Sequence, residues 1–179
     1  MYAFDFTIVE HLSAEHVLRI AQLNHTSFVK AHAHVLSDEA LSKCTVAAFE
    51  EGWSKYPNPK AKYGFAYNDQ DELLGFAVVS QCRHAGLESY GELRSLYVHP
   101  SHQRKGIGNA LLKWSMDAMR ATANGRMYVV VVAANASREF YIRTGAVPVT
   151  ALKRDVFGDM LDMDVLCYES RELLVIAEP

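Results

Sequence analysis

The residues best suited to chemistry lie in one short segment, Gln103-Arg-Lys-Gly-Ile-Gly108, which leads into an amphipathic stretch. Glycine has no Cβ, so its backbone can come close to a ligand. Free N–H groups at a helix start and the positive end of the helix dipole suit a phosphate group. Arg104 and Lys105 add positive charge beside Gly106 and Gly108. The segment therefore predicts a cradle for a diphosphate.

Two well-known nucleotide-binding loops do not fit this segment. A P-loop requires the pattern GxxxxGK[ST], which is absent from the sequence. A dinucleotide-binding loop requires a third glycine where Leu111 stands, and its glycines follow the strand closely. Here eight positions separate Gly106 from Val98, the last residue of the preceding predicted strand. The expected ligand is another molecule that carries a diphosphate.

The hydrophobic periodicity predicts the elements that position this loop. Ser13 caps a first helix, with His16 where a capping box would have Glu or Gln, and Ser37 opens a second helix that ends before Pro57. Strands are expected at residues 2–9, 63–68, 73–82, 92–98 and 127–133, helices at 107–122 and 137–144, and a final hairpin that turns at Gly158. Strand–helix–strand around residues 107–122 implies one parallel pair in a mostly antiparallel sheet. We expect a mixed α/β (α+β) fold and a single domain over residues 1–179.

The segment resembles the acetyl-CoA loop of the GNAT acetyltransferases, whose signature is [QR]xxGx[GA]. Gln103, Gly106 and Gly108 fill this signature, and the surrounding strand, loop and helix occur in the family's order. A second region, residues 134–147, resembles the family's next motif, with Tyr141 near the end of a short helix. The resemblance implies the GNAT fold, with a splayed parallel pair in its sheet.

The resemblance also implies that acetyl-CoA lies between the diverging ends of strands 92–98 and 127–133. The main chain of Leu96 and Val98 would bind the pantetheine, and amides from Arg104 to Asn109 would hold the pyrophosphate. The cofactor-binding residues that it implies are Leu96, Tyr97, Val98, Gln103, Arg104, Lys105, Gly106, Ile107, Gly108, Asn109 and Asn135. The family often has Asn seven positions before this tyrosine, where Ala134 stands here. Asn135, one position later, either reaches CoA or caps the helix.

The reaction that the resemblance implies is direct attack of an amine on a thioester, without an acyl-enzyme. Tyr141 is the candidate general acid for the departing thiolate, against the alternative of a core tyrosine. The backbone N–H near Val98 would polarise the carbonyl group. Glu92 is the candidate base, and the alternatives are a solvated charge at a strand end or a carboxylate that binds the substrate.

In this family the acceptor enters between the first helices and the final hairpin. These regions supply aromatic residues and carboxylates, which suit a cationic amine: Trp53, Tyr56, Phe157, Asp155, Asp159, Asp162 and Asp164. Core aromatics with a solubilising hairpin explain the same residues. The leading hypothesis is an N-acetyltransferase that acts on a primary amine of a small molecule. Acetylation of a protein N-terminus or lysine, and an acyl-CoA-binding sensor without turnover, remain as alternatives.

Composition excludes several other classes. The 179 residues are 50% hydrophobic with a formal net charge of −3 and no basic stripe, which argues against nucleic acid as a partner. Three widely spaced cysteines without a CxxC pair indicate reduced thiols and a cytoplasmic location. There is no signal-peptide pattern and no apolar run of about 18 residues. The eight histidines lack zinc-site spacing, so no metal is expected. A homodimer is a further possibility.

Overall fold

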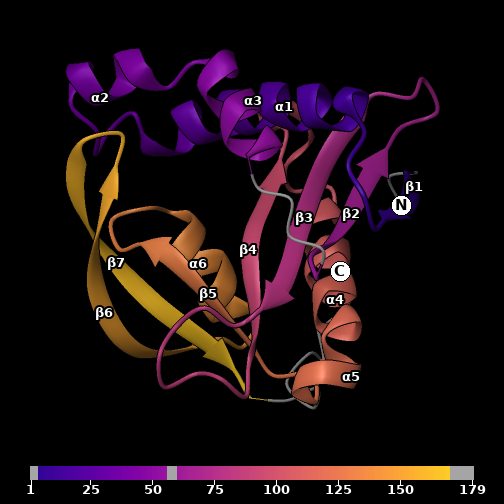
Figure 1. Ribbon diagram of the computed structural model, residues 1–179, viewed down its shortest axis with the longest axis vertical. Helices are drawn as coiled ribbons and strands as arrows, with labels where there is room; N and C mark the ends of the chain where they lie inside the picture. Colours follow the sequence, from indigo (N-terminus) through magenta and orange to yellow (C-terminus); the bar gives the residue numbers. More distant parts are fainter. Residues whose placement is uncertain (1–3, 56–59, 170–179) are drawn as a thin grey trace.

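A computed structural model of the chain describes residues 4–55 and 60–169. Within these residues a seven-stranded sheet has the order β1-β2-β3-β4-β5-β7-β6 (Figure 1). The strands are β1 (Asp5–Val9), β2 (Lys62–Tyr67), β3 (Leu73–Gln81), β4 (Gly91–Val98), β5 (Met127–Val132), β6 (Val147–Val156) and β7 (Asp159–Tyr168). Only β4 and β5 run parallel among the described pairs. The predicted mixed α/β fold with one parallel pair is confirmed.

Helix α1 (Ala14–His32) begins at the predicted cap, and a histidine completes the capping box. The His16 amide donates to Ser13 Oγ at 3.2 Å, and the Ser13 amide donates to His16 Nδ1 at 3.2 Å. The imidazole nitrogen thus accepts the hydrogen bond that a side-chain oxygen of Glu or Gln usually accepts at this position. Both N–H groups, which have no partner inside the helix, are thereby satisfied.

The second predicted helix is in fact two, α2 (Asp38–Lys43) and α3 (Val46–Ser54). Thr45 separates them, because its Oγ1 accepts a hydrogen bond from the Ala48 amide at 3.1 Å and so starts a new helix. Apolar residues at helical spacing continue across this break, which is why the sequence predicted a single helix. The predicted stop at Pro57 lies outside the described residues.

Helices cover both faces of the sheet. Successive residues of a strand point to opposite faces. Phe76 of β3 packs in a cluster with Ile20 and Leu23 of α1, whereas the neighbouring Ala77 packs in a cluster with Leu111 of α4 (Ile107–Ala118). We call the α1 side the front face and the α4 side the back face. The predicted helix over 107–122 breaks after Ala118, and a short α5 (Arg120–Ala123) follows.

The two parallel strands diverge soon after they pair. Residues Gly91–Leu93 of β4 pair with Met127–Val129 of β5, and the described ladder between the two strands ends there. β5 pairs along its whole length with β7 on its other side. Figure 1 shows β5 leaning away from β4 toward β7, with α6 (Ser137–Arg143) beside it. The last five residues of β4 therefore present an edge that β5 does not cover.

Candidate active site at the splayed strands

The glycine-rich loop has two residues with a positive φ, and only one of them is a glycine. Gly106 is the N-cap of α4 with φ of +87°, and Arg104, two positions earlier, also has a positive φ of +60°. Gly106 leaves the first turn of α4 without a side-chain cap. The first N–H groups of the helix thus remain available to an anionic ligand, and the side chains of Arg104 and Lys105 lie exposed beside them.

The exposed edge of β4 carries main-chain groups that point toward the splay. The His99 amide donates to the Leu74 carbonyl at 2.8 Å, and Tyr97 lies opposite Phe76 in the antiparallel register. Hydrogen-bonded and non-hydrogen-bonded pairs alternate along an antiparallel ladder. The N–H and C=O groups of Leu96 and Val98 therefore face away from β3, on the side where β5 diverges.

Two side chains hold the end of this edge. The Val98 carbonyl accepts hydrogen bonds from Ser27 Oγ of α1 and from Gln103 Nε2, each at 3.3 Å. Gln103 thereby folds the glycine-rich loop back onto the end of β4. Gly108 lies close by, since a Cβ there would stand 3.8 Å from Val98 and 3.6 Å from Phe140 of α6. The loop, the edge of β4 and α6 thus meet at the splay.

Tyr141 of α6 is buried, with 5% of its surface exposed. Burial is the main cause that raises its pKa well above the ordinary tyrosine value, and the phenols of Tyr168 and Tyr97 raise it further. The hydroxyl therefore holds its proton at neutral pH, as a general acid must before the reaction.

Tyr97 points to the front face, where it contacts Phe76 with ring centroids 5.7 Å apart. Burial raises its pKa to about 12, and the side chain of Asn24 acts in the opposite direction. Asn24 Oδ1 accepts a hydrogen bond from Trp53 Nε1 at 3.1 Å, while its buried Nδ2 has no partner at hydrogen-bond distance among the described residues.

Asn135 is buried and both ends of its amide are engaged within the protein. Its Oδ1 accepts from the Ser137 amide at 2.8 Å at the start of α6, and its Nδ2 lies 3.1 Å from His32 Nε2. His32 Nδ1 lies 2.8 Å from the Phe28 carbonyl, so Nδ1 carries the proton and Nε2 accepts from Asn135. Asn135 thus bonds the start of α6, through the Ser137 amide, to the end of α1, through His32.

Glu92 lies on the front face at the paired end of β4, and 5% of its surface is exposed. Its carboxylate accepts hydrogen bonds from Arg83 Nε at 2.7 Å and from Arg83 Nη2 at 2.6 Å. The Arg83 amide in turn donates to the hydroxyl of the buried Tyr128 at 3.2 Å. Glu92 precedes Leu96 by four positions along the strand, about 13 Å at the usual rise. Proton transfer from a substrate at the splay to Glu92 would therefore need intervening water.

The carboxylates of the final hairpin all have partners within the chain. Asp155 accepts from the Gly158 amide, Asp159 from Ser37, Asp162 from Lys153 and Asp164 from Arg138. Of the candidate aromatic residues, Trp53 and Phe157 pack in apolar clusters, and Tyr56 lies outside the described residues. The four predicted carboxylates therefore all have hydrogen-bond partners within the chain.

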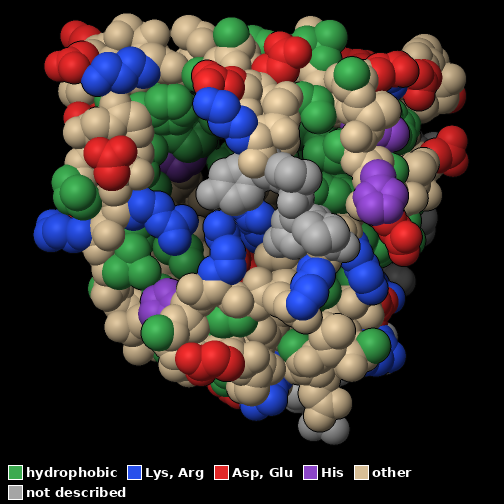
Figure 2. All heavy atoms as spheres, viewed as in Figure 1, with side chains coloured by type: hydrophobic (Ala, Val, Ile, Leu, Met, Phe, Trp, Pro, Cys, Tyr) green, Lys and Arg blue, Asp and Glu red, His purple; other side chains and the backbone are tan. Residues whose placement is uncertain are grey.

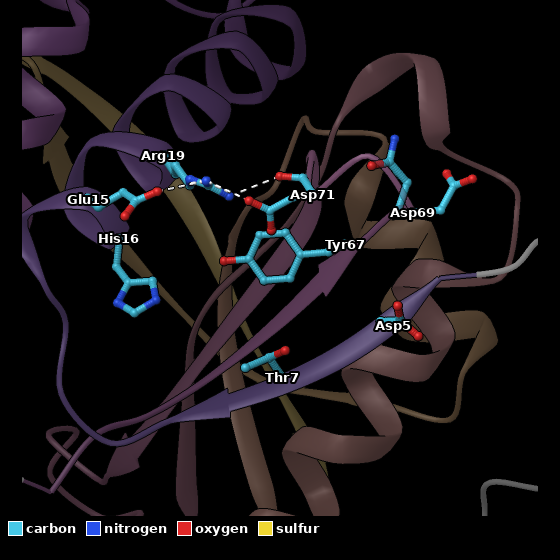
Figure 3. A pocket seen from close by; sticks show the side chains of 9 residues that line it. Asp5, Thr7, Glu15, His16, Arg19, Tyr67, Asp69 and Asp71 are labelled. Carbon is cyan, nitrogen blue, oxygen red and sulfur yellow. Dashed lines mark hydrogen bonds and ion pairs between the residues drawn. The ribbon is translucent and has the colours of Figure 1, made fainter.

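A separate polar hollow of about 480 Å³ lies at the β1 edge of the sheet (Figure 3). Arg19 is at its centre, donating to Glu15 Oε1 at 2.7 Å and to Asp71 Oδ2 at 2.8 Å. These bonds tie α1 to the turn between β2 and β3. None of the predicted cofactor-binding or catalytic residues lines this hollow, and we assign it a structural role.

Residues 4–55 and 60–169 contain no group of three or more His, Cys, Asp or Glu side chains placed to hold a metal ion. None of the helices in these two ranges is both long and apolar enough to span a membrane. Cys44, Cys82 and Cys167 are present as free thiols.

The sequence profile described as the acetyltransferase (GNAT) family matches residues 19–146. The chain belongs to the GNAT acetyltransferase family. A search of curated proteins found no match.

Several solved structures resemble this GNAT protein. The PaiA N-acetyltransferase of Thermoplasma acidophilum, in complex with coenzyme A, is 20% identical, with a TM-score of 0.60 over 89% of this chain and 98% of that one. The yncA protein of Salmonella typhimurium, with its cofactor acetyl-CoA, is 19% identical, with a TM-score of 0.62 over 93% and 95%. The ribosomal-protein alanine N-acetyltransferase of Escherichia coli is 17% identical, with a TM-score of 0.63 over 91% and 92%. These likenesses show the shared fold.

Sequence reasoning missed three residues that shape the site of this GNAT protein. Ser27 contacts the end of β4, Arg83 binds Glu92, and His32 binds Asn135. One signal was present for Ser27, which stands seven positions after Ile20 on the apolar side of α1, where a polar residue is unusual. No local pattern marked Arg83 or His32.

Proposed function

We propose that this protein transfers an acetyl group from acetyl-CoA to a primary amine of a small molecule. The observation that carries the proposal is the uncovered edge of β4, whose Leu96 and Val98 main-chain groups point into the splay next to the start of α4. An extended amide-containing chain such as pantetheine can pair with such an edge as an added strand would. Family membership and the coenzyme complexes of two similar structures support the choice of acetyl-CoA.

In this proposal the pyrophosphate binds the amides from Arg104 to Asn109 at the start of α4, with Gln103 fixing the loop. Gly106 supplies the left-handed turn that exposes these amides. The positive charges of Arg104 and Lys105 raise the local affinity for the anion. Asn135 acts indirectly, by starting α6 and so placing Tyr141.

The amine nitrogen would attack the thioester carbonyl carbon and form a tetrahedral intermediate. The carbon–sulfur bond then breaks, the nitrogen loses a proton, and the thiolate gains one from Tyr141. Main-chain N–H near Val98 would stabilise the negative oxygen of the intermediate. Glu92 would accept the amine proton through water, with Arg83 holding its carboxylate in place.

We also propose a cytoplasmic location, since the three free thiols suit a reducing compartment. We further propose that residues 1–179 form a single domain. Thiol release from acetyl-CoA, measured across a panel of small amines and peptides, tests the proposed activity. Release with small amines supports it. Release with peptides alone would favour a protein acceptor, and coenzyme binding without release would favour a sensor.

A further inference from the structure

The tip of the β6–β7 hairpin is bonded to the connection between α1 and α2. The Asp159 carboxylate accepts from the Ser37 amide at 2.6 Å and from Ser37 Oγ at 3.0 Å. Ser37 is also the N-cap of α2, since its Oγ accepts from the Ala40 amide at 3.1 Å. One carboxylate thus fixes both the start of a helix and the position of the hairpin. We call Ser37, Phe157 and Asp159 the hairpin clasp.

Phe157, the third residue of the clasp, lies in the turn between β6 and β7. Its φ of +56° is unusual for a residue with a bulky side chain, and such a conformation persists only where surrounding contacts hold it. Its ring lies edge-on to Phe28 of α1 and Phe49 of α3, with centroid separations of 5.7 Å and 5.5 Å. Phe28 and Phe49 are themselves 5.4 Å apart. The turn is therefore bent so that one aromatic ring is inserted between two helices.

A second set of contacts closes the same side of the splay. His34 Nε2 lies 3.1 Å from the Ala134 carbonyl oxygen, to which it donates a hydrogen bond. The neighbouring hydrogen bond joins His32 to Asn135. The α1–α2 connection is thus bonded both to the hairpin tip and to the loop before α6. Figure 2 shows a hollow below the helices and beside the hairpin, bordered by hydrophobic side chains and by Lys and Arg side chains.

We propose that the hairpin clasp restricts the acceptor to compact primary amines with an apolar body, which reach the splay through this front hollow. The inference rests on the proposed acetyl transfer and narrows its substrate class. An extended peptide advances about 3.3 Å per residue and needs a groove that is open at both ends. In this proposal the Ser37–Asp159 bonds close the end of such a groove between the hairpin and the α1–α2 connection. Polyamines are disfavoured because the hairpin carboxylates are engaged within the chain.

The test combines a structural and a kinetic measurement on the full-length protein. The structural readout is hydrogen exchange of the Ser37 amide in the wild type, in Asp159→Ala and in Asp69→Ala. Asp69 is a matched control, because it is an exposed carboxylate in a different hairpin turn. The kinetic readout is thiol release from acetyl-CoA with 2-phenylethylamine, spermidine, or a hexapeptide with a free N-terminus and one lysine.

We expect a protected Ser37 amide in the wild type, exchange at least about tenfold faster in Asp159→Ala, and no change in Asp69→Ala. We also expect 2-phenylethylamine to exceed both other acceptors in kcat/KM by at least about tenfold in the wild type. Asp159→Ala should raise the rate with the hexapeptide relative to 2-phenylethylamine. Rapid Ser37 exchange in the wild type, or comparable rates with the hexapeptide or spermidine, would overturn the inference. If no acceptor releases thiol, the proposed function fails, while Ser37 exchange still shows whether the clasp is closed.

Discussion

Gly106 and Gly108 stand two residues apart in the coenzyme loop, and the structure gives them different roles. Gly106 has φ of +87°, a region in which an L-residue with a Cβ is strained by about 1–2 kcal/mol. A Cβ at Gly108 would lie 3.6 Å and 3.7 Å from Phe140 and 3.8 Å from Val98, which are ordinary contacts. Alanine should therefore be costly at the first position and tolerated at the second.

We expect Gly106→Ala to lower the free energy of unfolding by about 1–2 kcal/mol, which corresponds to a Tm lower by about 2–8 °C for a chain of this size. If the loop relieves this strain by leaving its binding conformation, the Kd for CoA should rise by about 5- to 30-fold. Gly108→Ala should retain stability or gain about 0.5–1 kcal/mol, because alanine favours a helix.

Urea unfolding measures the first quantity and isothermal titration of CoA the second, with both variants compared to the wild type. Equal losses of stability and affinity in Gly106→Ala and Gly108→Ala would show that the left-handed turn at Gly106 is not what shapes the cradle. In the same titration, Gly108→Val should weaken CoA binding, since its two γ-methyl groups extend toward Phe140 and Val98.

Three further results are expected. Tyr141→Phe should lower kcat by about 100-fold and leave the Kd for CoA within about twofold of the wild type, and an unchanged kcat would remove Tyr141 from the acid role. Arg83→Met should destabilise the fold by about 1–3 kcal/mol in urea, because it leaves the buried Glu92 carboxylate without its partner. The double variant with Glu92→Gln should regain most of this loss, whereas additive losses would argue against the pair. Burial lowers the pKa of His32, so the unfolded state binds its proton first as pH falls below about 6.5. The free energy of unfolding should therefore decrease from pH 7 to pH 5, and His32→Gln should flatten this dependence.

The arrangement at Glu92 bears on how the reaction handles protons. A carboxylate held by two guanidinium N–H groups is well fixed but distant from the splay, so a water chain would have to connect it to the acceptor. The α-amine of a small molecule, with a reference pKa near 7.7–8.0, depends little on such a chain. An alkylamine with a reference pKa near 10.4 depends on it strongly. The pH dependence of kcat/KM in Glu92→Gln therefore reports on the acceptor as well as on the base.

The sequence by itself determined the features that depend on neighbouring residues. The glycines of residues 103–108, the amphipathic helix after them and the apolar run of β5 are local patterns, and together they predicted the order of strands, the parallel pair and the coenzyme loop. Where the local signal was ambiguous, the prediction was wrong, as at Thr45, where an apolar pattern runs across the boundary between two helices.

The tertiary structure alone decided which partners the polar residues have. Asn135 and His32 are 103 positions apart, and Ser37 and Asp159 are 122 positions apart. Such pairs meet only because the sheet order places β7 and β6 beyond β5, which brings the hairpin and the loop before α6 to the end of α1. A side chain's hydrogen-bond partner depends on this packing and not on its neighbours in sequence. The aspartates of the hairpin suggested a cation site in the sequence, and the fold pairs them with Gly158, Ser37, Lys153 and Arg138.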